Sequence, residues 1–430
     1  MNVRRLYAAT TLVAAISALP SHVIAASPSV ASPVLTTIFR FDGAKKGSLP
    51  QAGVTADPAG TGVLYGVTTG GGAYGSGIAF KLKPAAGKNL WPITILHDFK
   101  GNGSNADGRN PMAELLVSPG TGAIYGTTAN GGPNDKGTVF QLLPPRSGQT
   151  AWRQSVLANF DNYQARGANP RSALIFGGKN SLLGTALLGG GKNDGTAFRL
   201  TQPSGKGWGF SLLHTFGATS NDGVQPAAGL VRDPSTNVLY GTTVTGGKHN
   251  SGTVYSLTQG GGQTTILYSF TGGNDGGAPT GNIIIGADGS LYGTASIGGA
   301  FNNGVVFQLK PVSGKWKFRV LHQFLGGSND GAQPKGLAVG TGGVLYGATL
   351  YGGGSSICTG GCGTVFKMTP PSGGGQVWTE TLLHRFGGRS DSSAPQGTLA
   401  VDTNDNDTLY GTTTGGNTGN DYGTVFRLRH

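Results

Sequence analysis

The sequence is poor in the residues from which most enzyme and metal sites are built. Among 430 residues there are two cysteines and seven histidines, and glutamate occurs only at Glu114 and Glu380. Such scarcity argues against a glycosidase that works through a pair of carboxyl groups. The G-x-S-x-G and H-E-x-x-H motifs of serine hydrolases and zinc peptidases are also missing. We therefore expect no catalytic residues and no metal site.

Long apolar runs are absent beyond the first 26 residues. Residues 1–26 carry Arg4 and Arg5, an apolar stretch over 6–19 and small residues at their end, the pattern of a secretory signal peptide. We expect this segment to be removed, residues 27–34 to form a short linker, and the mature chain to be periplasmic or extracellular without a transmembrane segment. Loss of two arginines lowers the formal charge from +12 to 12 − 2 = +10. This charge favours acidic partners, whereas scattered basic residues and export argue against nucleic acid.

The two cysteines, Cys358 and Cys362, stand in a short glycine-rich segment. In an oxidising compartment such a pair predicts a local disulfide. A metal site would need two more ligands, and no histidine is near. A redox role for the C-x3-C pair stays open as an alternative.

Glycine is abundant, with 80 residues, and it recurs within a repeated pattern. Each unit contains an L-Y-G tag, then a G-T-V-F tag, then W-x4-L-H-x-F or a relic of it, with turn residues between them. The seven L-Y-G tags are 52 to 64 residues apart and centre on Tyr65, Tyr125, Leu183, Tyr240, Tyr292, Tyr346 and Tyr410. With a short apolar run before each L-Y-G, every unit reads as four short strands, and no sustained helical period appears. The length of the unit and its four strands are typical of a propeller blade.

The third tag is missing after the last unit, because the sequence ends at His430. A strand of the missing type, residues 35–41, stands alone before the first L-Y-G. If this strand completes the last blade, the ring closes without unpaired edges. The sequence thus predicts an all-β fold over residues 35–430, a seven-bladed β-propeller of four-stranded blades whose last blade is closed by the N-terminal strand.

The paired tags G-x-L-Y-G-T-T-x-x-G-G and G-T-V-F-x-L resemble those of the GloVer-type tandem-repeat family, a group of bacterial exported Gly/Val-rich repeat proteins. The resemblance covers essentially the whole mature chain and implies export and a repeat architecture, with no catalytic set to carry over. The third unit departs from the pattern because it has Leu183 in place of the tyrosine. The sixth unit departs from it because it contains the additional cysteine loop.

Residues that recur at one position of most units are expected to serve the scaffold. We interpret three sets in this way: the tryptophans and histidines of the third tag, and the aspartates of the loop after it. They are Trp91, Trp152, Trp208, Trp316 and Trp378; His97, His214, His322 and His384; and Asp107, Asp222, Asp275, Asp330 and Asp391. Asn-Asp-Gly is ordinary turn chemistry. Calcium remains the alternative cofactor, although each loop offers about one carboxylate where calcium needs six to eight oxygens; otherwise no cofactor is expected.

With the strands of a blade lettered a to d from the axis outward, the d-to-a and b-to-c loops emerge on one face, here called the loop face. These loops are the longer ones, and binding residues usually lie on such loops. Their unrepeated aromatic and cationic residues suit stacking on sugars and pairing with acidic groups. The ligand-binding candidates are Tyr74, Arg109, Tyr163, Arg171, Phe301, Tyr351, Arg389 and Tyr422.

The sequence therefore favours an exported, non-catalytic binding module for acidic carbohydrate or a cell-envelope partner. Two alternatives stay open. One is a carbohydrate-active hydrolase or lyase in the central funnel, which would need carboxylates converging from different blades. The other is a structural or protein-docking module.

Overall fold

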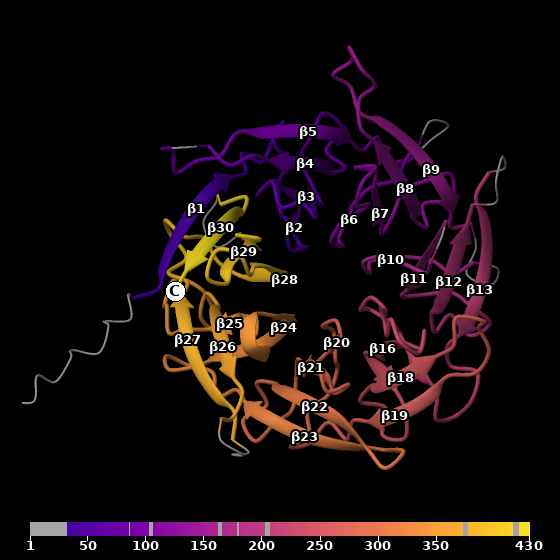
Figure 1. The fold of residues 1–430 in the computed structure, drawn as a ribbon, viewed down its shortest axis with the longest axis vertical. Coiled ribbons are helices and arrows are strands. Elements are labelled where there is room, and N and C mark those ends of the chain that lie inside the picture. The colour runs from indigo at the N-terminus through magenta and orange to yellow at the C-terminus, as the bar shows by residue number, and fades with distance from the viewer. Residues whose placement is uncertain are drawn as a thin grey trace, which may run out of the picture. The chain divides into compact units, whose positions relative to one another are not determined.

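The computed structural model describes residues 32–85, 87–102, 106–161, 166–178, 180–202, 207–372, 377–415 and 421–430. The predicted signal peptide lies outside these ranges, as does most of the predicted linker. From Pro33 to His430 the chain forms seven four-stranded antiparallel sheets, which are the blades of a β-propeller (Figure 1). The predicted fold class is confirmed. Within the described ranges, no helix has the length and apolar character that crossing a membrane requires.

Each blade has four strands, and in six blades they are hydrogen-bonded in chain order from the axis outward, whereas the outermost strand of the seventh is the first strand of the chain. The a strands are β2 (Thr55–Ala56), β6 (Leu116–Val117), β10 (Ile175–Phe176), β15 (Val231–Arg232), β20 (Ile284–Ile285), β24 (Gly331–Val339) and β28 (Pro395–Asp402). The b strands, which carry L-Y-G, are β3 (Leu64–Thr68), β7 (Ile124–Thr128), β11 (Ser181–Ala186), β16 (Leu239–Thr243), β21 (Leu291–Ala295), β25 (Leu345–Gly352) and β29 (Thr408–Thr413).

The two outer positions of each blade carry the other two tags. The c strands are β4 (Ile78–Leu82), β8 (Thr138–Leu143), β12 (Thr196–Thr201), β18 (Thr253–Leu257), β22 (Val305–Val312), β26 (Thr364–Thr369) and β30 (Thr424–Arg429). The d strands are β5 (Ile93–Asp98), β9 (Arg153–Asn159), β13 (Gly209–Thr215), β19 (Thr265–Ser269), β23 (Lys315–Gln323), β27 (Thr379–Arg385) and β1 (Val34–Arg40). A ribbon of β14 (Gly223–Val224) with β17 (Thr245–Gly246) and a 3-10 turn, η1 (Thr341–Gly343), complete the described elements. Blades are numbered 1 to 7 from β2.

The L-Y-G and G-T-V-F tags recur together because their glycine and aromatic residue are cross-strand partners. In blade 1, Gly66 on β3 pairs with Phe80 on β4. A Cβ atom on Gly66 would lie 2.5 Å from the Phe80 ring, and the six equivalent glycines are as tight, at 2.4–2.7 Å. The ring is therefore buried over the glycine of the neighbouring strand, and any side chain at that glycine would overpack the blade.

Successive blades are joined by a contact between the glycine of G-T-V-F and a proline of the next d-to-a loop. Gly137 of blade 2 has a positive φ of 98°, and a Cβ there would lie 2.6 Å from Pro170 Cδ, at the entrance to blade 3. The same contact joins Gly423 of blade 7 to Pro50 of blade 1. Because the proline is held in this way at every seam, the residue after it takes the same place on the inner side of each blade.

The recurring tryptophans and histidines serve the scaffold, as predicted. Trp316 packs on Tyr240 of the preceding blade with ring centroids 5.9 Å apart, so the tryptophan joins blades. Each histidine of the third tag binds the aspartate of the following loop through Nε2. The pairs are His97–Asp107 at 2.8 Å and His214–Asp222, His322–Asp330 and His384–Asp391 at 3.0 Å. We call this pair the His–Asp clasp.

The ring is closed by the N-terminal strand, as the incomplete last unit predicted. The strand β1 pairs antiparallel with β30, from Val34 opposite Arg429 to Arg40 opposite Thr424. In Figure 1 the indigo β1 lies along the yellow β30. Blade 7 therefore combines the two ends of the described chain and has no open outer edge on β30.

Candidate functional site

The centre of the propeller holds a pocket to which all seven units contribute the same repeat position. This axial pocket has a volume of about 160 Å³. The residue after the d-to-a proline lines it in every blade. These residues are Gln51, Met112, Arg171, Ala227, Thr280, Lys335 and Gln396. Because the position is the same but the residues differ, the scaffold repeats while the chemistry of the pocket does not.

Two side chains two positions further along the chain bind the backbone of other blades close to the axis. The Glu114 carboxylate in blade 2 accepts hydrogen bonds from the backbone N–H of Thr398 in blade 7, at 2.9 Å, and of Gly53 in blade 1, at 3.4 Å. Asn282 in blade 5 accepts a 2.9 Å bond from the N–H of Gly229 in blade 4. These bonds occupy the Glu114 carboxylate and tie the innermost strands together.

Two cations enter the axial pocket from blades 3 and 6. The Arg171 guanidinium donates from Nε to Asn169 Oδ1 at 2.8 Å, which is a neutral partner. Neither Arg171 nor Lys335 has a carboxylate within 4.0 Å in the described part of the chain. Burial lowers the pKa of the Lys335 ammonium and also that of the Arg171 guanidinium. Both charges are thus partly desolvated without an ion-pair partner, which disfavours them unless an anion is bound nearby.

A second, larger hollow lies on the loop face between blades 5 and 6. This groove has a volume of about 790 Å³ and runs between the d-to-a loop that leads to β24 and the b-to-c loop of blade 6. Its lining includes Ser328, Gln333, Tyr351 and Thr359. The Tyr351 side chain offers an aromatic face and polar groups surround it, which is the composition that sugar rings favour.

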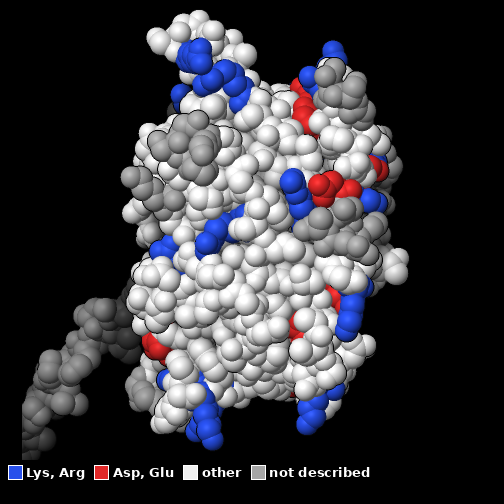
Figure 2. All heavy atoms as spheres, turned by 90° about the vertical axis from the view of Figure 1, so that its right-hand side faces the viewer, with Lys and Arg blue, Asp and Glu red and all other residues white. Residues whose placement is uncertain are grey.

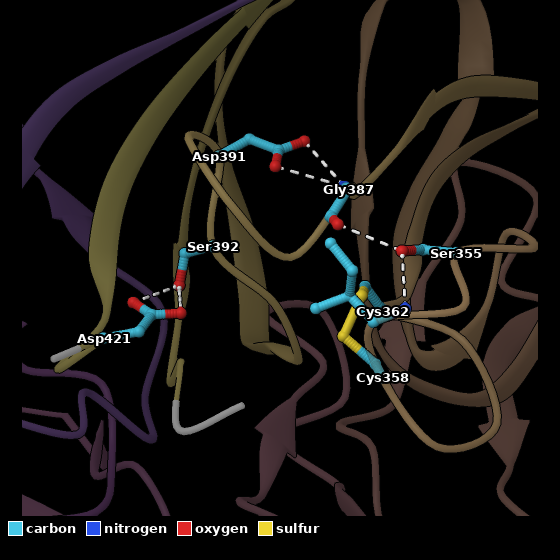
Figure 3. The surroundings of a disulfide bond; sticks show 8 residues. Ser355, Cys358, Cys362, Gly387, Asp391, Ser392 and Asp421 are labelled. Carbon is cyan, nitrogen blue, oxygen red and sulfur yellow. Dashed lines mark hydrogen bonds between the residues drawn. A yellow bond between two sulfur atoms is a disulfide. The ribbon is translucent and has the colours of Figure 1, made fainter. Parts of the chain in front are cut away.

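The cysteine loop forms one wall of this groove, and its predicted disulfide is confirmed. Cys358 and Cys362 are bonded, with their Cα atoms 5.1 Å apart. Figure 3 shows Ser355 of the same loop donating to the carbonyl of Gly387, at 3.0 Å, while Asp391 accepts the Gly387 N–H. The inserted loop is therefore fastened to the next d-to-a loop, which gives the groove a rigid wall.

The structure distributes the predicted ligand-binding residues over several places. Arg171 lines the axial pocket and Tyr351 lines the groove. Tyr74 and Phe301 are exposed on b-to-c loops, at 58% and 55% of their full area, and Arg389 is exposed in a d-to-a loop.

Three further candidates have other surroundings. Arg109 forms a two-pronged ion pair with Asp135, at 3.0 and 2.7 Å, and this pairing raises the Arg109 pKa. The half-buried Tyr422 ring lies against Gly43, where a Cβ atom would approach it to 2.5 Å. Tyr163 lies outside the described residues.

Sequence reasoning missed most of the axial pocket, including Gln51, Thr280 and Gln396. A signal was present, because each of them directly follows the single proline of its d-to-a loop. The repeated tags do not mark these residues, because they share a repeat position but not an identity.

Charged side chains do not form one large patch on the side of the molecule shown in Figure 2. Lysine and arginine side chains are spread there in small groups among uncharged residues, with a few acidic ones between them. On this side, the positive net charge therefore gives a diffuse field and no single basic surface.

A sequence profile of the Gloeobacter/Verrucomicrobia repeat matches residues 27–236 and 206–426. The chain belongs to this family. The two matches together run from ahead of β1 into β30, so the repeat of the Gloeobacter/Verrucomicrobia family spans all seven blades, in agreement with the resemblance seen in the tags. No curated protein matches the sequence.

Solved structures align with this Gloeobacter/Verrucomicrobia repeat protein at low sequence identity. A putative 6-phosphogluconolactonase from Bacteroides fragilis aligns with a TM-score of 0.51 and 13% identity, covering 83% of this chain and 89% of the other. The soluble aldose sugar dehydrogenase of Escherichia coli aligns with a TM-score of 0.45 and 15% identity, covering 93% and 99%. At such identities the likeness concerns the fold alone.

Proposed function

We propose that this Gloeobacter/Verrucomicrobia repeat protein is an exported, non-catalytic binding module for acidic carbohydrate, and that the acidic group of the ligand enters the axial pocket. The observation that carries the proposal is the pair of cations, Arg171 and Lys335, which line one pocket and have no carboxylate within 4.0 Å among the described residues. A bound carboxylate would supply the missing counter-charge to both.

The remaining lining of the axial pocket suits the hydroxyl groups of a sugar. Gln51 and Gln396 bring amide groups that both donate and accept hydrogen bonds. The Thr280 hydroxyl oxygen is buried and has no hydrogen-bond partner within the described structure. A ligand that offers a carboxylate and several hydroxyls would satisfy all of these groups.

The size of the pocket limits how much of the ligand can enter. A volume of about 160 Å³ is below the ~300–1,000 Å³ of pockets that enclose drug-sized molecules. We therefore propose that one acidic residue, either a free sugar acid or the end of an acidic chain, occupies the axial pocket.

The alternative function, a hydrolase in the central funnel, requires two carboxyl groups in the axial pocket. Among the described lining residues of the axial pocket Glu114 is the one carboxylate, and backbone N–H groups of two blades bind it. We therefore give binding the preference over hydrolysis.

Calorimetric titration with sodium glucuronate tests the proposal, with glucose as the matched neutral sugar. We expect glucuronate to bind at least about tenfold more tightly than glucose, and high salt to weaken glucuronate binding, because the main attraction is between charges. Lys335→Met keeps most of the side-chain length and removes the charge. It should weaken binding by about tenfold or more, as should Arg171→Gln.

The controls separate the axial pocket from the loop face. Lys248→Met removes an exposed lysine from a b-to-c loop and should leave the affinity unchanged. Tyr351→Ala and Arg389→Ala should also have no effect. If these two weaken binding while Lys335→Met does not, the site is on the loop face and the axial assignment is wrong. The absence of binding to any of a panel of sugar acids would remove the proposed function itself.

A further inference from the structure

The His–Asp clasp at the seam between blades 5 and 6 differs from the equivalent clasps in one residue. In two other blades, the residue four positions before the histidine position of the third tag contacts the aspartate or the histidine position of the preceding blade. Thr264 donates a 2.9 Å hydrogen bond to Asp222, and Phe318 stacks on Tyr268 with ring centroids 3.9 Å apart. At the seam between blades 5 and 6 this position is Glu380, one of the two glutamates in the sequence. The scaffold role of the clasp therefore does not explain this carboxylate.

Glu380 joins His322 and Asp330 in a compact cluster of three ligand-type side chains. One nitrogen or oxygen atom from each lies within 4.8 Å of the other two. His322 Nε2 and Asp330 Oδ2 are 3.0 Å apart, which is the separation of two ligands bound to one ion at about 2.1 Å and at a right angle. A metal ion could thus take the place of the proton between them with small side-chain adjustments.

The Glu380 carboxylate lies close to a second carboxylate in partly buried surroundings. Glu380 Oε1 is sealed from solvent and has no hydrogen-bond partner among the described residues. The Asp330 side chain is 4% exposed and lies close by. The shielded Oε1 of Glu380 and the buried Asp330 carboxylate lie close enough together to favour a divalent cation between them.

The surroundings of Asp330 fit the role of a fixed ligand. Its Oδ2 accepts the Leu325 N–H at 2.8 Å, and its Oδ1 accepts the Gly331 N–H at 2.6 Å. Such outer hydrogen bonds orient a carboxylate ligand. The His322 side chain is 20% exposed, so an ion has access from solvent.

We propose that His322, Asp330 and Glu380 form a binding site for a divalent transition metal that links blades 5 and 6. One imidazole nitrogen and two carboxylate oxygens suit Zn²⁺ or Mn²⁺. Three protein ligands leave a coordination position for water. Binding uses the Nε2 lone pair of His322, so the ion displaces the proton that lies between His322 and Asp330.

Titration of the tag-free protein with Co²⁺, followed by its visible absorption, and with Zn²⁺ by calorimetry tests this site. We expect one ion per chain. Glu380→Gln and His322→Gln keep the side-chain volume and remove a ligand, and each should weaken binding by about 100-fold or more. His384→Gln is the matched control, because it breaks a clasp of the same 3.0 Å geometry that lies outside the cluster. It should leave metal binding unchanged.

Circular dichroism establishes that each variant is folded before its affinity is compared. Zn²⁺ should raise the melting temperature of the wild type and of His384→Gln, and should not raise that of Glu380→Gln. The proposal is overturned if the wild type takes up no ion at millimolar metal. It is also overturned if folded Glu380→Gln or His322→Gln binds as tightly as the wild type. Should one of these two variants fail to fold, the other decides.

Discussion

Deleting residues 33–41, which contribute β1, should destabilise the whole propeller and not only its last blade. Without β1, the β30 strand loses six register pairs and presents an unpaired edge. Blade 7 also loses the side chains that seal it against blade 1. Ile38, Phe39 and Phe41 are at most 7% exposed and belong to a core cluster with Phe80 of β4.

The size of the effect follows from these contacts. The Phe41 ring lies 5.1 Å from Phe39 and 5.4 Å from Phe80, so it packs within blade 7 and across the seam. Replacing such a buried phenylalanine by alanine costs about 3–5 kcal/mol. With Ile38 and Phe39 lost as well, the summed cost approaches the ~5–15 kcal/mol of total stability that folded proteins have.

Thermal and urea unfolding followed by circular dichroism measure the loss. The deletion should lower the melting temperature strongly, and Phe41→Ala should lower the free energy of unfolding by about 3–5 kcal/mol. Val34→Ala, at a residue that is 61% exposed, is the control and should change it by less than about 0.5 kcal/mol. A synthetic peptide of residues 33–42 should restore stability by adding the strand in trans, whereas one with alanine at positions 39 and 41 should not. An unchanged melting temperature after the deletion would refute the closure argument.

Two further substitutions test the scaffold. Gly347→Ala would place a Cβ atom 2.4 Å from the Phe366 ring and should lower the free energy of unfolding, measured in urea, by about 1–3 kcal/mol. Gly209→Ala is the control, because its Cβ atom would lie 3.7 Å from the nearest atom, and it should be close to neutral. Equal effects of the two substitutions would contradict the overpacking argument. Asp233 accepts hydrogen bonds from the side chain and the backbone N–H of Ser235. Together with hydrogen bonds from Thr236, they hold the pKa of Asp233 at about 2, below the usual 3.8. A lowered pKa contributes stability above about pH 4 that is lost as the pH falls toward 2. The difference in urea midpoint between the wild type and Asp233→Ala should therefore shrink between pH 6 and pH 2, and a constant difference would show that Asp233 is not ionised in the turn.

Much of the fold could be predicted because its determinants are local and are repeated seven times. The glycine of L-Y-G and the aromatic residue of G-T-V-F are cross-strand partners within one hairpin, so the spacing of the tags already sets the strand order and register. The single strand at residues 35–41 and the incomplete unit at the other end predicted the closure in the same way. The disulfide between Cys358 and Cys362 could also be predicted, because the two cysteines are close in the chain.

The candidate sites depend on contacts between blades, which the sequence does not display. Arg171 and Lys335 lie at one repeat position but far apart in the chain, and only closure of the ring brings them to a common pocket. Glu380 reads as an outer-strand residue until the seam places it beside His322 and Asp330. The residues therefore determine each blade by themselves, because hairpin pairing is local. The tertiary structure decides which unrepeated side chains meet, because the axis and the seams exist only once seven blades have packed together.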